Sequence, residues 1–310
     1  MKPKLFSGRS NPDFGRAVAD YLEQEMGEVT IRSFSDGELW VRFDENIRGE
    51  DVFIIQSTNP PDTNMIELLL MLDAAKRASA RRVTAVVPYY GYARQDRKDQ
   101  PRVPISAKLF ADLIQTAGAD RVVSMDLHSS QIQGYFNIPF DHLYSKRALV
   151  SAIKKLKLEK LMVLAPDIGS VPMSRSYAQL LDAKLAIIDK RRPDHNKAEV
   201  MNLIGEVKDH NVLIMDDMVD TAGTLTAAAQ VAKDRGAHSV HAACTHGVLS
   251  GPAVERISSS PIEKLLVTDA IRIDEEKKFD KLEMVSVAPV FGEAIRRIHN
   301  EESISVLFSL

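Results

Sequence analysis

Short β-branched runs alternate with amphipathic segments along most of this chain, and this alternation is the feature that most constrains its fold. The predicted strands are almost continuously apolar, which is typical of strands covered by helices on both faces. Helical patterns such as 65–78, 105–116 and 224–235 lie between them. Such alternation predicts an α/β fold with mainly parallel sheets. The predicted strands are 83–88, 121–126, 160–166, 184–189, 211–217, 238–244 and 264–269.

The first fifty residues differ from the rest, because residues 38–43 (ELWVRF) alternate in polarity and predict an exposed antiparallel hairpin or flap. Later in the chain, two apolar strands end in proline and two end in Met-Asp. This repetition predicts two similar domains, which we place at residues 1–146 and 147–310. A chain of 310 residues is long enough for two domains.

Composition excludes several classes of protein. The net charge of −3 argues against a nucleic-acid binder with a large basic field. The sequence contains no apolar run long enough to span a membrane, and residues 1–10 lack the apolar stretch of a signal peptide. Cys244 is the single cysteine, so no intrachain disulfide can form. We therefore expect a cytoplasmic protein without a membrane or nucleic-acid partner.

Residues 212–225 (VLIMDDMVDTAGTL) predict a strand that ends in acids and leads through small residues into a helix. The backbone N–H groups at this turn and the helix N-terminus suit a phosphate. The carboxylates would repel a bare phosphate, so the ligand must also offer hydroxyls or a metal ion, as ribose 5-phosphate does. The alternative is an ordinary acidic turn with Asp220 as helix cap. The candidate residues are Asp216, Asp217, Asp220, Thr221, Ala222, Gly223 and Thr224.

This segment resembles the ribose-phosphate loop of type I phosphoribosyltransferases and of class I ribose-phosphate pyrophosphokinases. Segments 88–108, 125–136, 187–205 and 286–308, with the motifs FSGRS, RSFSDGE and THGVLSGPA, resemble the pyrophosphokinases alone. The likeness covers nearly the whole chain. It implies two domains of the type I phosphoribosyltransferase fold. It also implies transfer of the diphosphate of ATP to O1 of ribose 5-phosphate, which gives phosphoribosyl diphosphate (PRPP) and AMP.

The loop YARQDRKD after the strand at 83–88 carries groups that suit ATP. Arg94 can fork onto phosphate oxygens and Gln95 can bond a base or ribose. From spacing alone, a solvated loop is an equal alternative, and the resemblance implies the ATP role.

The resemblance also implies that the flap binds adenine. Phe34 would stack on the base, and Asp36, Gly37 and Glu38 would complete the contact. Without the resemblance, the pattern favours Phe34 as a core residue of the hairpin. In the family this flap reaches the active site of a neighbouring subunit, so we expect a homo-oligomer, and specifically a hexamer.

The resemblance implies two further catalytic elements. Lys190 and Arg192 belong to a loop that closes over the triphosphate, where they neutralise charge as the bond breaks, and Arg192 also contacts ribose 5-phosphate. His128 and Asp167 are the implied protein ligands of Mg²⁺. Because Mg²⁺ prefers oxygen, triphosphate oxygens and water would supply the other ligands.

Two departures from the family pattern matter. Regulatory anion sites of the family match Arg48, Ser130, Gln133, Ser303, Ser305 and Phe308, but His142 stands where an asparagine is common. The diphosphate loop usually reads Asp-x-Gly-Gly, whereas this chain has Ser170 at the second glycine. A serine at this position has three alternative consequences. It is unstrained and donates its hydroxyl to the diphosphate, it holds a strained backbone, or it spoils the site. We favour the first.

Two rival functions share part of this pattern. A phosphoribosyltransferase would share residues 216–224 but has no need of the loop at 88–108 or of an ATP flap. A non-catalytic regulatory relative would be expected to lack groups such as Lys190 or Asp220, which this chain retains. Neither a GxxxxGK[ST] string nor a GxGxxG string occurs, so the commoner nucleotide-binding folds receive no support.

Overall fold

The computed structural model describes residues 2–191 and 200–307 and divides into two compact units. Unit 1 comprises Met1–Ser145, Ala270–Arg272 and Val287–Leu310. Unit 2 comprises Lys146–Asp269 and Ile273–Ser286. Among the described residues, no helix is both long enough and apolar enough to cross a membrane.

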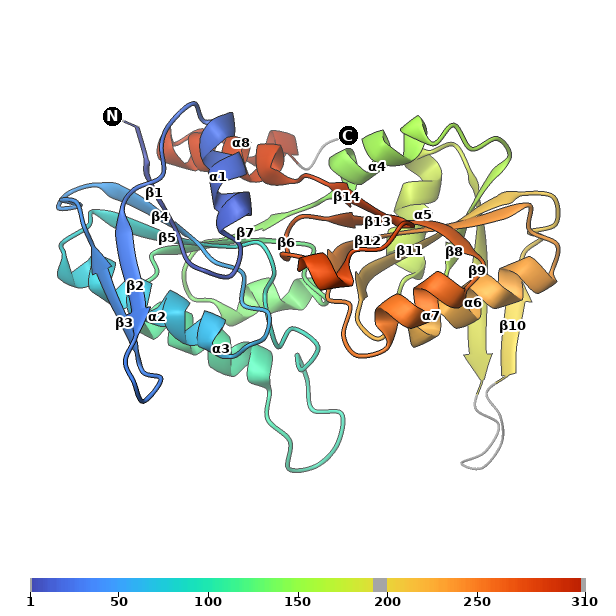
Figure 1. Ribbon diagram of the computed structural model, residues 1–310, viewed down its shortest axis with the longest axis horizontal. Coiled ribbons are helices and arrows are strands. Elements are labelled where there is room, and N and C mark those ends of the chain that lie inside the picture. Colours follow the sequence, from blue (N-terminus) through green and yellow to red (C-terminus); the bar gives the residue numbers. More distant parts are fainter. Residues whose placement is uncertain (1, 192–199, 308–310) are drawn as a thin grey trace. The chain divides into compact units, whose positions relative to one another are not determined.

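Unit 1 is built on a five-stranded parallel sheet in the order β1-β4-β5-β6-β7. Figure 1 shows α1 and α8 on one side of this sheet and α2 and α3 on the other. The strands are β1 (Lys4–Ser7), β4 (Asp51–Ile55), β5 (Arg82–Val87), β6 (Arg121–Met125) and β7 (Phe140–Leu143). The helices are α1 (Pro12–Tyr21), α2 (Thr63–Arg77), α3 (Ser106–Thr116) and α8 (Ala288–His299), with short 3-10 turns at Ser130–Tyr135 and Ser305–Leu307.

The flap of unit 1 is a separate antiparallel hairpin of β2 (Val29–Ser33) and β3 (Leu39–Phe43). Its inner apolar side chains pack on the core that α2 and α3 form with the sheet. The ring of Phe43 contacts that of Phe6 edge-on, with centroids 4.6 Å apart. The base of the hairpin is thus anchored, while its tip extends away from the sheet (Figure 1).

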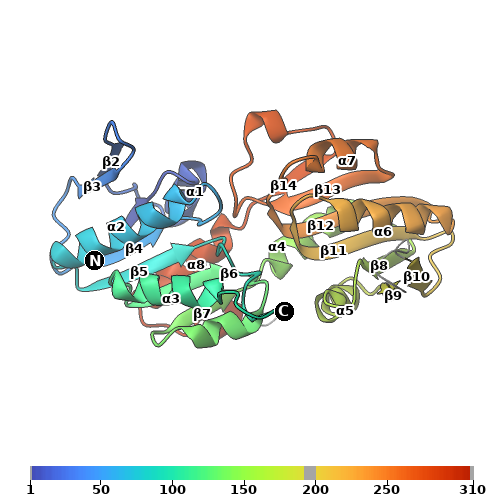
Figure 2. The ribbon, with the colours of Figure 1, turned by 90° about the horizontal axis from the view of Figure 1, so that it is seen from below.

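Unit 2 is built on a seven-stranded sheet in the order β10-β9-β8-β11-β12-β13-β14, parallel except at β10. Figure 2 shows α5 and α6 on opposite faces of this sheet. The strands are β8 (Leu161–Ala165), β9 (Lys184–Arg191), β10 (Val200–Ile204), β11 (Asn211–Val219), β12 (Ser239–Gly247), β13 (Ile262–Thr268) and β14 (Leu282–Val285). The helices are α4 (Lys146–Lys155), α5 (Val171–Leu180), α6 (Gly223–Asp234) and α7 (Ala253–Ser259), with a 3-10 turn at Glu275–Lys277.

The register of β11 determines where its acidic residues lie. β11 pairs with β8 only from Asn211 to Ile214, but it continues beside β12 as far as Val219. Asp216 and Asp217 therefore lie beyond the end of β8, at the carboxyl edge of the parallel sheet. Open α/β sheets bind their ligands at this edge.

The predicted α/β class with mainly parallel sheets and an N-terminal antiparallel flap is confirmed. The contact-based units differ from the predicted ranges 1–146 and 147–310 at the C-terminus, because α8 packs on α1 within unit 1. Phe14 and Phe291 join the two helices edge-on, with ring centroids 5.4 Å apart. The boundary between two similar domains stays a prediction.

Candidate functional site

The turn between β11 and α6 in unit 2 has the shape expected of an anion site. Ala222 occupies the capping position of α6 in the left-handed region, with φ of 60°, and its methyl side chain cannot cap the helix. The first turn of a helix leaves backbone N–H groups without intrahelical partners. Because these groups lie at the positive end of the helix dipole, they attract phosphate.

The backbone of this turn is strained at Ala222, one of the candidate phosphate-binding residues. A left-handed conformation costs a non-glycine residue about 1–2 kcal/mol, and it falls on Ala222 and not on Gly223. The cap position is occupied by Ala222 and not by Asp220, which argues against the ordinary acidic-cap interpretation of this segment. Strain of this kind persists where surrounding structure holds it, and it concentrates at binding sites.

The acidic residues before the turn repel one another. Burial, followed by the charge of Asp217, a hydrogen bond with Asp217 and the charge of Asp167, raises the pKa of Asp216 to about 8. The backbone N–H of Asp217 donates to Asp216 Oδ1 at 3.0 Å. A cation or hydroxyl donors beside these carboxylates would favour their ionised form.

Asp167 and Ser170 belong to the loop between β8 and α5, within unit 2. Ser170 has φ of −83° and ψ of −4°, an ordinary helical conformation, so serine is unstrained where the family pattern has glycine. Its Oγ donates to Asp167 O at 3.0 Å, and its backbone N–H donates to Asp167 Oδ1 at 2.9 Å. The hydroxyl therefore orders Asp167, whereas we expected it to face the diphosphate.

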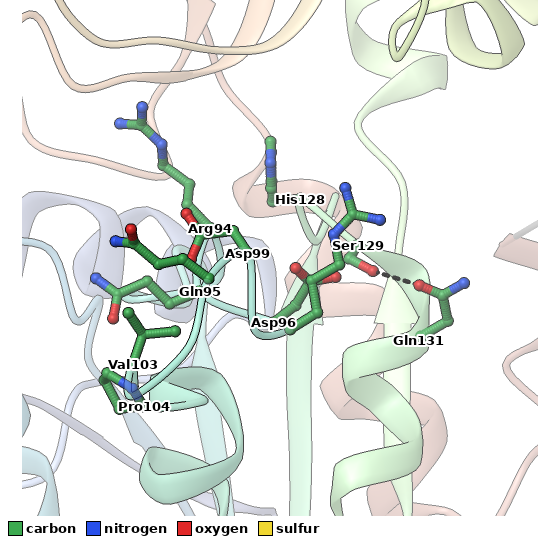
Figure 3. A pocket seen from close by; sticks show the side chains of 11 residues that line it. Arg94, Gln95, Asp96, Asp99, Val103, Pro104, His128, Ser129 and Gln131 are labelled. Atoms are coloured by element: carbon green, nitrogen blue, oxygen red, sulfur yellow. Dashed lines mark hydrogen bonds between the residues drawn. The ribbon is translucent and has the colours of Figure 1, made fainter.

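Unit 1 carries a separate pocket of about 670 Å³ between the loop after β5 and the turn after β6. In Figure 3 the side chains of Arg94 and His128 extend in the same direction from opposite walls. Both are exposed, and Gln95 lines the pocket beside Arg94. The lining residues are Arg94, Gln95, Asp96, Arg97, Asp99, Gln100, Val103, Pro104, His128, Ser129 and Gln131. The structure thus brings the predicted ATP residues of this loop together with one predicted metal ligand.

Hydrogen bonds, most of them buried, hold the loop that lines this pocket. Thr58, which is 3% exposed, accepts from Gly91 N at 2.7 Å through Oγ1 and donates to Tyr89 O at 3.1 Å through the same hydroxyl. Its carbonyl lies 2.2 Å from where a Cβ on Gly91 would be, so only glycine fits there. Farther along, Ser106 Oγ donates to Gln95 Oε1 and Tyr90 OH donates to Ala107 O.

The tip of the flap presents its side chains outward. Phe34 is 49% exposed, so the interpretation of Phe34 as a hairpin core residue is wrong. Gly37 has φ of 94°, which a tight tip requires, and Glu38 N donates to Asp36 Oδ1 at 3.0 Å. The guanidinium of Arg32 lies over the ring of Trp40, 4.2 Å from its centroid. An exposed aromatic residue at a hairpin tip is a ready surface for stacking.

The predicted catalytic pair is only partly visible. The backbone of Lys190 lies in β9, where it pairs with Met201 of β10. Arg192 lies outside the described residues, as does Phe308 of the predicted regulatory set.

The rest of the predicted regulatory set is exposed and lies in unit 1. Arg48, Ser130, Gln133, Ser303 and Ser305 are all on the surface. Ser303 Oγ and Ser305 Oγ lie 2.8 Å apart. His142, by contrast, is buried, and its Nε2 accepts from Leu127 N at 3.0 Å.

The donor set for a metal ion is sparse. Among residues 2–191 and 200–307, no three His, Cys, Asp or Glu side chains gather as metal ligands. Asp167 offers an ordered carboxylate, and His128 offers an exposed imidazole. These two groups belong to different units, and each by itself would suit an ion that takes most of its ligands from phosphate and water, as Mg²⁺ commonly does.

Sequence reasoning missed two residues that shape these sites. Thr58 acts from a loop about thirty positions before its partners, and Arg256 of α7 donates through Nη1 to Thr221 O at 3.0 Å. Neither residue lies in the segment that it holds. The only sequence signal for Arg256 was its nearness to the motif THGVLSGPA.

Comparison with known proteins covers nearly the whole chain. Residues 3–118 match the N-terminal domain of ribose phosphate pyrophosphokinase, and residues 191–309 match a phosphoribosyl synthetase-associated domain. The ribose-phosphate pyrophosphokinase of Chlorobaculum tepidum is 54% identical over 306 residues, 98% of this chain and 94% of that protein. That of Bacillus subtilis is 50% identical over 307 residues, 99% of this chain and 97% of that protein.

The fold is also that of a solved structure. The crystal structure of phosphoribosylpyrophosphate synthetase from Mycobacterium smegmatis superposes with a TM-score of 0.91 at 40% identity. The likeness covers 97% of this chain and 100% of that one.

Proposed function

This chain belongs to the family of ribose-phosphate pyrophosphokinases, and we propose that it transfers the β,γ-diphosphate of ATP to O1 of ribose 5-phosphate, giving PRPP and AMP. One observation carries the proposal: full-length relatives that bear this name are about half identical to the chain from end to end. The two loops described above supply a place for each substrate.

Ribose 5-phosphate would bind at the turn after β11. Its phosphate would accept from backbone N–H groups of residues 221–224, and its 2′- and 3′-hydroxyls would donate to carboxylates among Asp216, Asp217 and Asp220. The left-handed Ala222, at the N-terminus of α6, supports the phosphate contact. The raised pKa of Asp216 supports a ligand that brings hydroxyl donors or positive charge to the carboxylates.

ATP would bind in unit 1. Arg94 would hold phosphate oxygens, Gln95 would bond the nucleoside, and Phe34 would stack on adenine beside Asp36, Gly37 and Glu38. The pocket that Arg94 and Gln95 line and the half-exposed ring of Phe34 support this assignment. Since the flap tip extends from its own sheet, we propose that it completes the site of a neighbouring subunit in a homohexamer. Sedimentation velocity would determine the assembly.

In the proposed reaction, O1 of ribose 5-phosphate attacks the β-phosphorus in line, and the bond from that phosphorus to the oxygen of the α-phosphate breaks. AMP is the leaving group. Lys190 and Arg192 would neutralise the charge that develops on the α-phosphate oxygen, and Arg192 would also contact the sugar phosphate. The protein thus contributes positioning and electrostatic stabilisation without a covalent intermediate.

Mg²⁺ would be held by His128 and Asp167 together with phosphate oxygens and water. When bound, the ion would neutralise part of the triphosphate charge. The bond from Ser170 N to Asp167 Oδ1 would keep that carboxylate oriented.

The buried single cysteine, Cys244, fits a protein of the reducing cytoplasm, where we place it.

The reaction distinguishes this function from its rivals. We expect AMP to form from ATP only when ribose 5-phosphate is present, and the β- and γ-phosphorus atoms of ATP to appear in PRPP. Chromatography of the nucleotides with ³¹P spectra of the products would measure both. A phosphoribosyltransferase would instead consume PRPP and a base, and a regulatory relative would yield neither product. ADP formation without AMP would contradict the proposal.

A further inference from the structure

Three consecutive carbonyl groups at the end of β11 accept hydrogen bonds from one nearby stretch of chain, residues 248–256, which we call the supporting segment. The carbonyl of Val219 accepts from two consecutive backbone N–H groups, and that of Asp220 accepts from a third. The carbonyl of Thr221 accepts from the side chain of Arg256. All four distances are 3.0 Å, and the donors are Val248 N, Leu249 N, Ser250 N and Arg256 Nη1.

The supporting segment has a special backbone that makes this arrangement possible. Leu249 and Gly251 both have positive φ, of 49° and 52°. These left-handed residues turn the chain within three positions, so successive N–H groups face the end of β11 before α7 begins. Residues 248–253 of the segment belong to the motif THGVLSGPA, for which the proposed reaction gives no role.

Fixing these carbonyls also fixes the N–H groups of the turn. In a trans peptide unit the carbonyl of one residue and the N–H of the next point in opposite directions. The bond to Asp220 O therefore directs the N–H of Thr221 away from the supporting segment. The bond from Arg256 to Thr221 O does the same for the N–H of Ala222. These N–H groups belong to the turn that would cradle the phosphate.

Arg256 adds a permanent positive charge at the same place. Its Nη1 lies 3.4 Å from where a Cβ on Gly223 would be, beside the first residue of α6. A guanidinium keeps its charge at all physiological pH values and has five N–H donors, of which the bond to Thr221 uses one. An arginine on a short surface helix would otherwise be an ordinary solvated side chain.

We infer that Arg256 is a positioning residue for the phosphate of ribose 5-phosphate. It holds the carbonyl of Thr221, and thereby directs the N–H of Ala222, while its charge favours an anion at the turn. This inference rests on the proposed function. It assigns to the supporting segment the task of keeping the left-handed turn ready for its ligand.

Titration calorimetry with ribose 5-phosphate, and separately with ATP, tests the inference. Arg256→Met removes the charge and the donors but keeps the length of the side chain. We expect it to raise the Kd for ribose 5-phosphate about tenfold, the size of effect typical of one charged hydrogen bond. The Kd for ATP should stay within about twofold. Arg256→Lys, which restores the charge, should recover part of the loss.

Arg235→Met is the matched control, because Arg235 is exposed at the opposite end of α6 and its loss removes the same charge. It should bind both substrates like the parent. Equal Kd values for ribose 5-phosphate in the parent and in Arg256→Met would overturn the inference and leave the proposed function standing. An equal rise in the Kd values for ribose 5-phosphate and ATP in Arg256→Met would also overturn the inference. A parent that binds ribose 5-phosphate but forms no AMP would count against the proposed function alone.

Discussion

The loop that follows β5 in unit 1 is held by side-chain hydroxyls together with backbone bonds, whereas the turn that follows β11 in unit 2 is held mainly by backbone N–H groups. In the first, the hydroxyl of Thr58 bonds both Gly91 N and Tyr89 O, and Ser106 bonds the side chain of Gln95. In the second, residues 248–250 donate from their backbone to Val219 and Asp220.

This difference follows from what each loop is proposed to bind. The unit 1 loop offers long side chains such as Arg94 to ATP. Its backbone is not proposed to contact the ligand, so hydrogen bonds from neighbouring side chains are enough to hold it. The unit 2 turn offers its own N–H groups to a phosphate, so its peptide orientation is itself the site. Side-chain substitutions should therefore weaken the first loop directly, and the second only through residues that touch its carbonyls or its carboxylates.

The largest effect should come from a residue in neither loop. The two loops are proposed to bind substrate, whereas Lys190 is proposed to stabilise the transition state. Lys190→Ala should therefore cut turnover roughly a hundred- to a thousandfold, because loss of one correctly placed charge costs about 3–4 kcal/mol in the transition state. ATP affinity should hardly change. Steady-state AMP formation and ATP titration measure the two quantities. Lys184→Ala, at the exposed start of β9, is the control. Wild-type turnover in Lys190→Ala would refute the catalytic role.

Asp220→Ala tests the unit 2 turn through a carboxylate. Loss of a charged hydrogen bond to a ribose hydroxyl costs about 1.5–3 kcal/mol, so the KM for ribose 5-phosphate should rise about ten- to a hundredfold. The KM for ATP should remain that of the parent. Asp234→Ala, at the far end of α6, removes an exposed carboxylate as the control. A rise in the ATP KM alone would mean that the substrates are assigned to the wrong loops.

Thr58→Val tests the two hydrogen bonds that the Thr58 hydroxyl makes to the unit 1 loop. The variant leaves Gly91 N without its acceptor, so we expect about a fivefold rise in the KM for ATP, from about 1 kcal/mol for one buried bond. Thr58→Ser should restore the parent value. Thr84→Val is the control, because it makes the same change at a buried hydroxyl of β5 that has no hydrogen-bond partner among the described residues. It should not change the KM for ATP. An equal rise in the KM for ATP in both valine variants would show that the Thr58 hydroxyl bonds have no specific effect.

Ser170→Gly should leave AMP formation largely intact. Since Ser170 has negative φ, glycine relieves no strain, and the loss is confined to the bonds that order Asp167. Turnover should change by less than about tenfold, or 1.4 kcal/mol. Ser170→Ala separates the hydroxyl from the added backbone freedom. If the parent is inactive and Ser170→Gly restores AMP formation, the chain is a degenerate member of its family.

The sequence predicted the features that depend on neighbouring residues. The strand at 211–217, its acidic end and the helix after Gly223 were all visible, because each is encoded within a few positions of itself. The same holds for the antiparallel flap, whose alternating polarity marks one buried face and one exposed face. The pocket loop was visible as a group of polar side chains.

Features that depend on distant partners were not visible. Nothing in the pattern indicates that α8 returns to pack on α1, or that Thr58 bonds a loop about thirty residues later. The left-handed turn fell on Ala222, although sequence rules favour glycine, because the bonds to Val219, Asp220 and Thr221 outweigh the local preference. Such bonds are set by tertiary structure, which local patterns do not encode.

The central claim is that each substrate has its own loop. Hydrogen–deuterium exchange of the parent protein, with each substrate added alone, tests it without any substitution. Ribose 5-phosphate should slow exchange in residues 220–226 and leave residues 88–107 unchanged. ATP with Mg²⁺ should slow exchange in residues 88–107 and in the flap tip, and leave residues 220–226 unchanged. Protection of residues 88–107 by ribose 5-phosphate, with none in residues 220–226, would contradict the account.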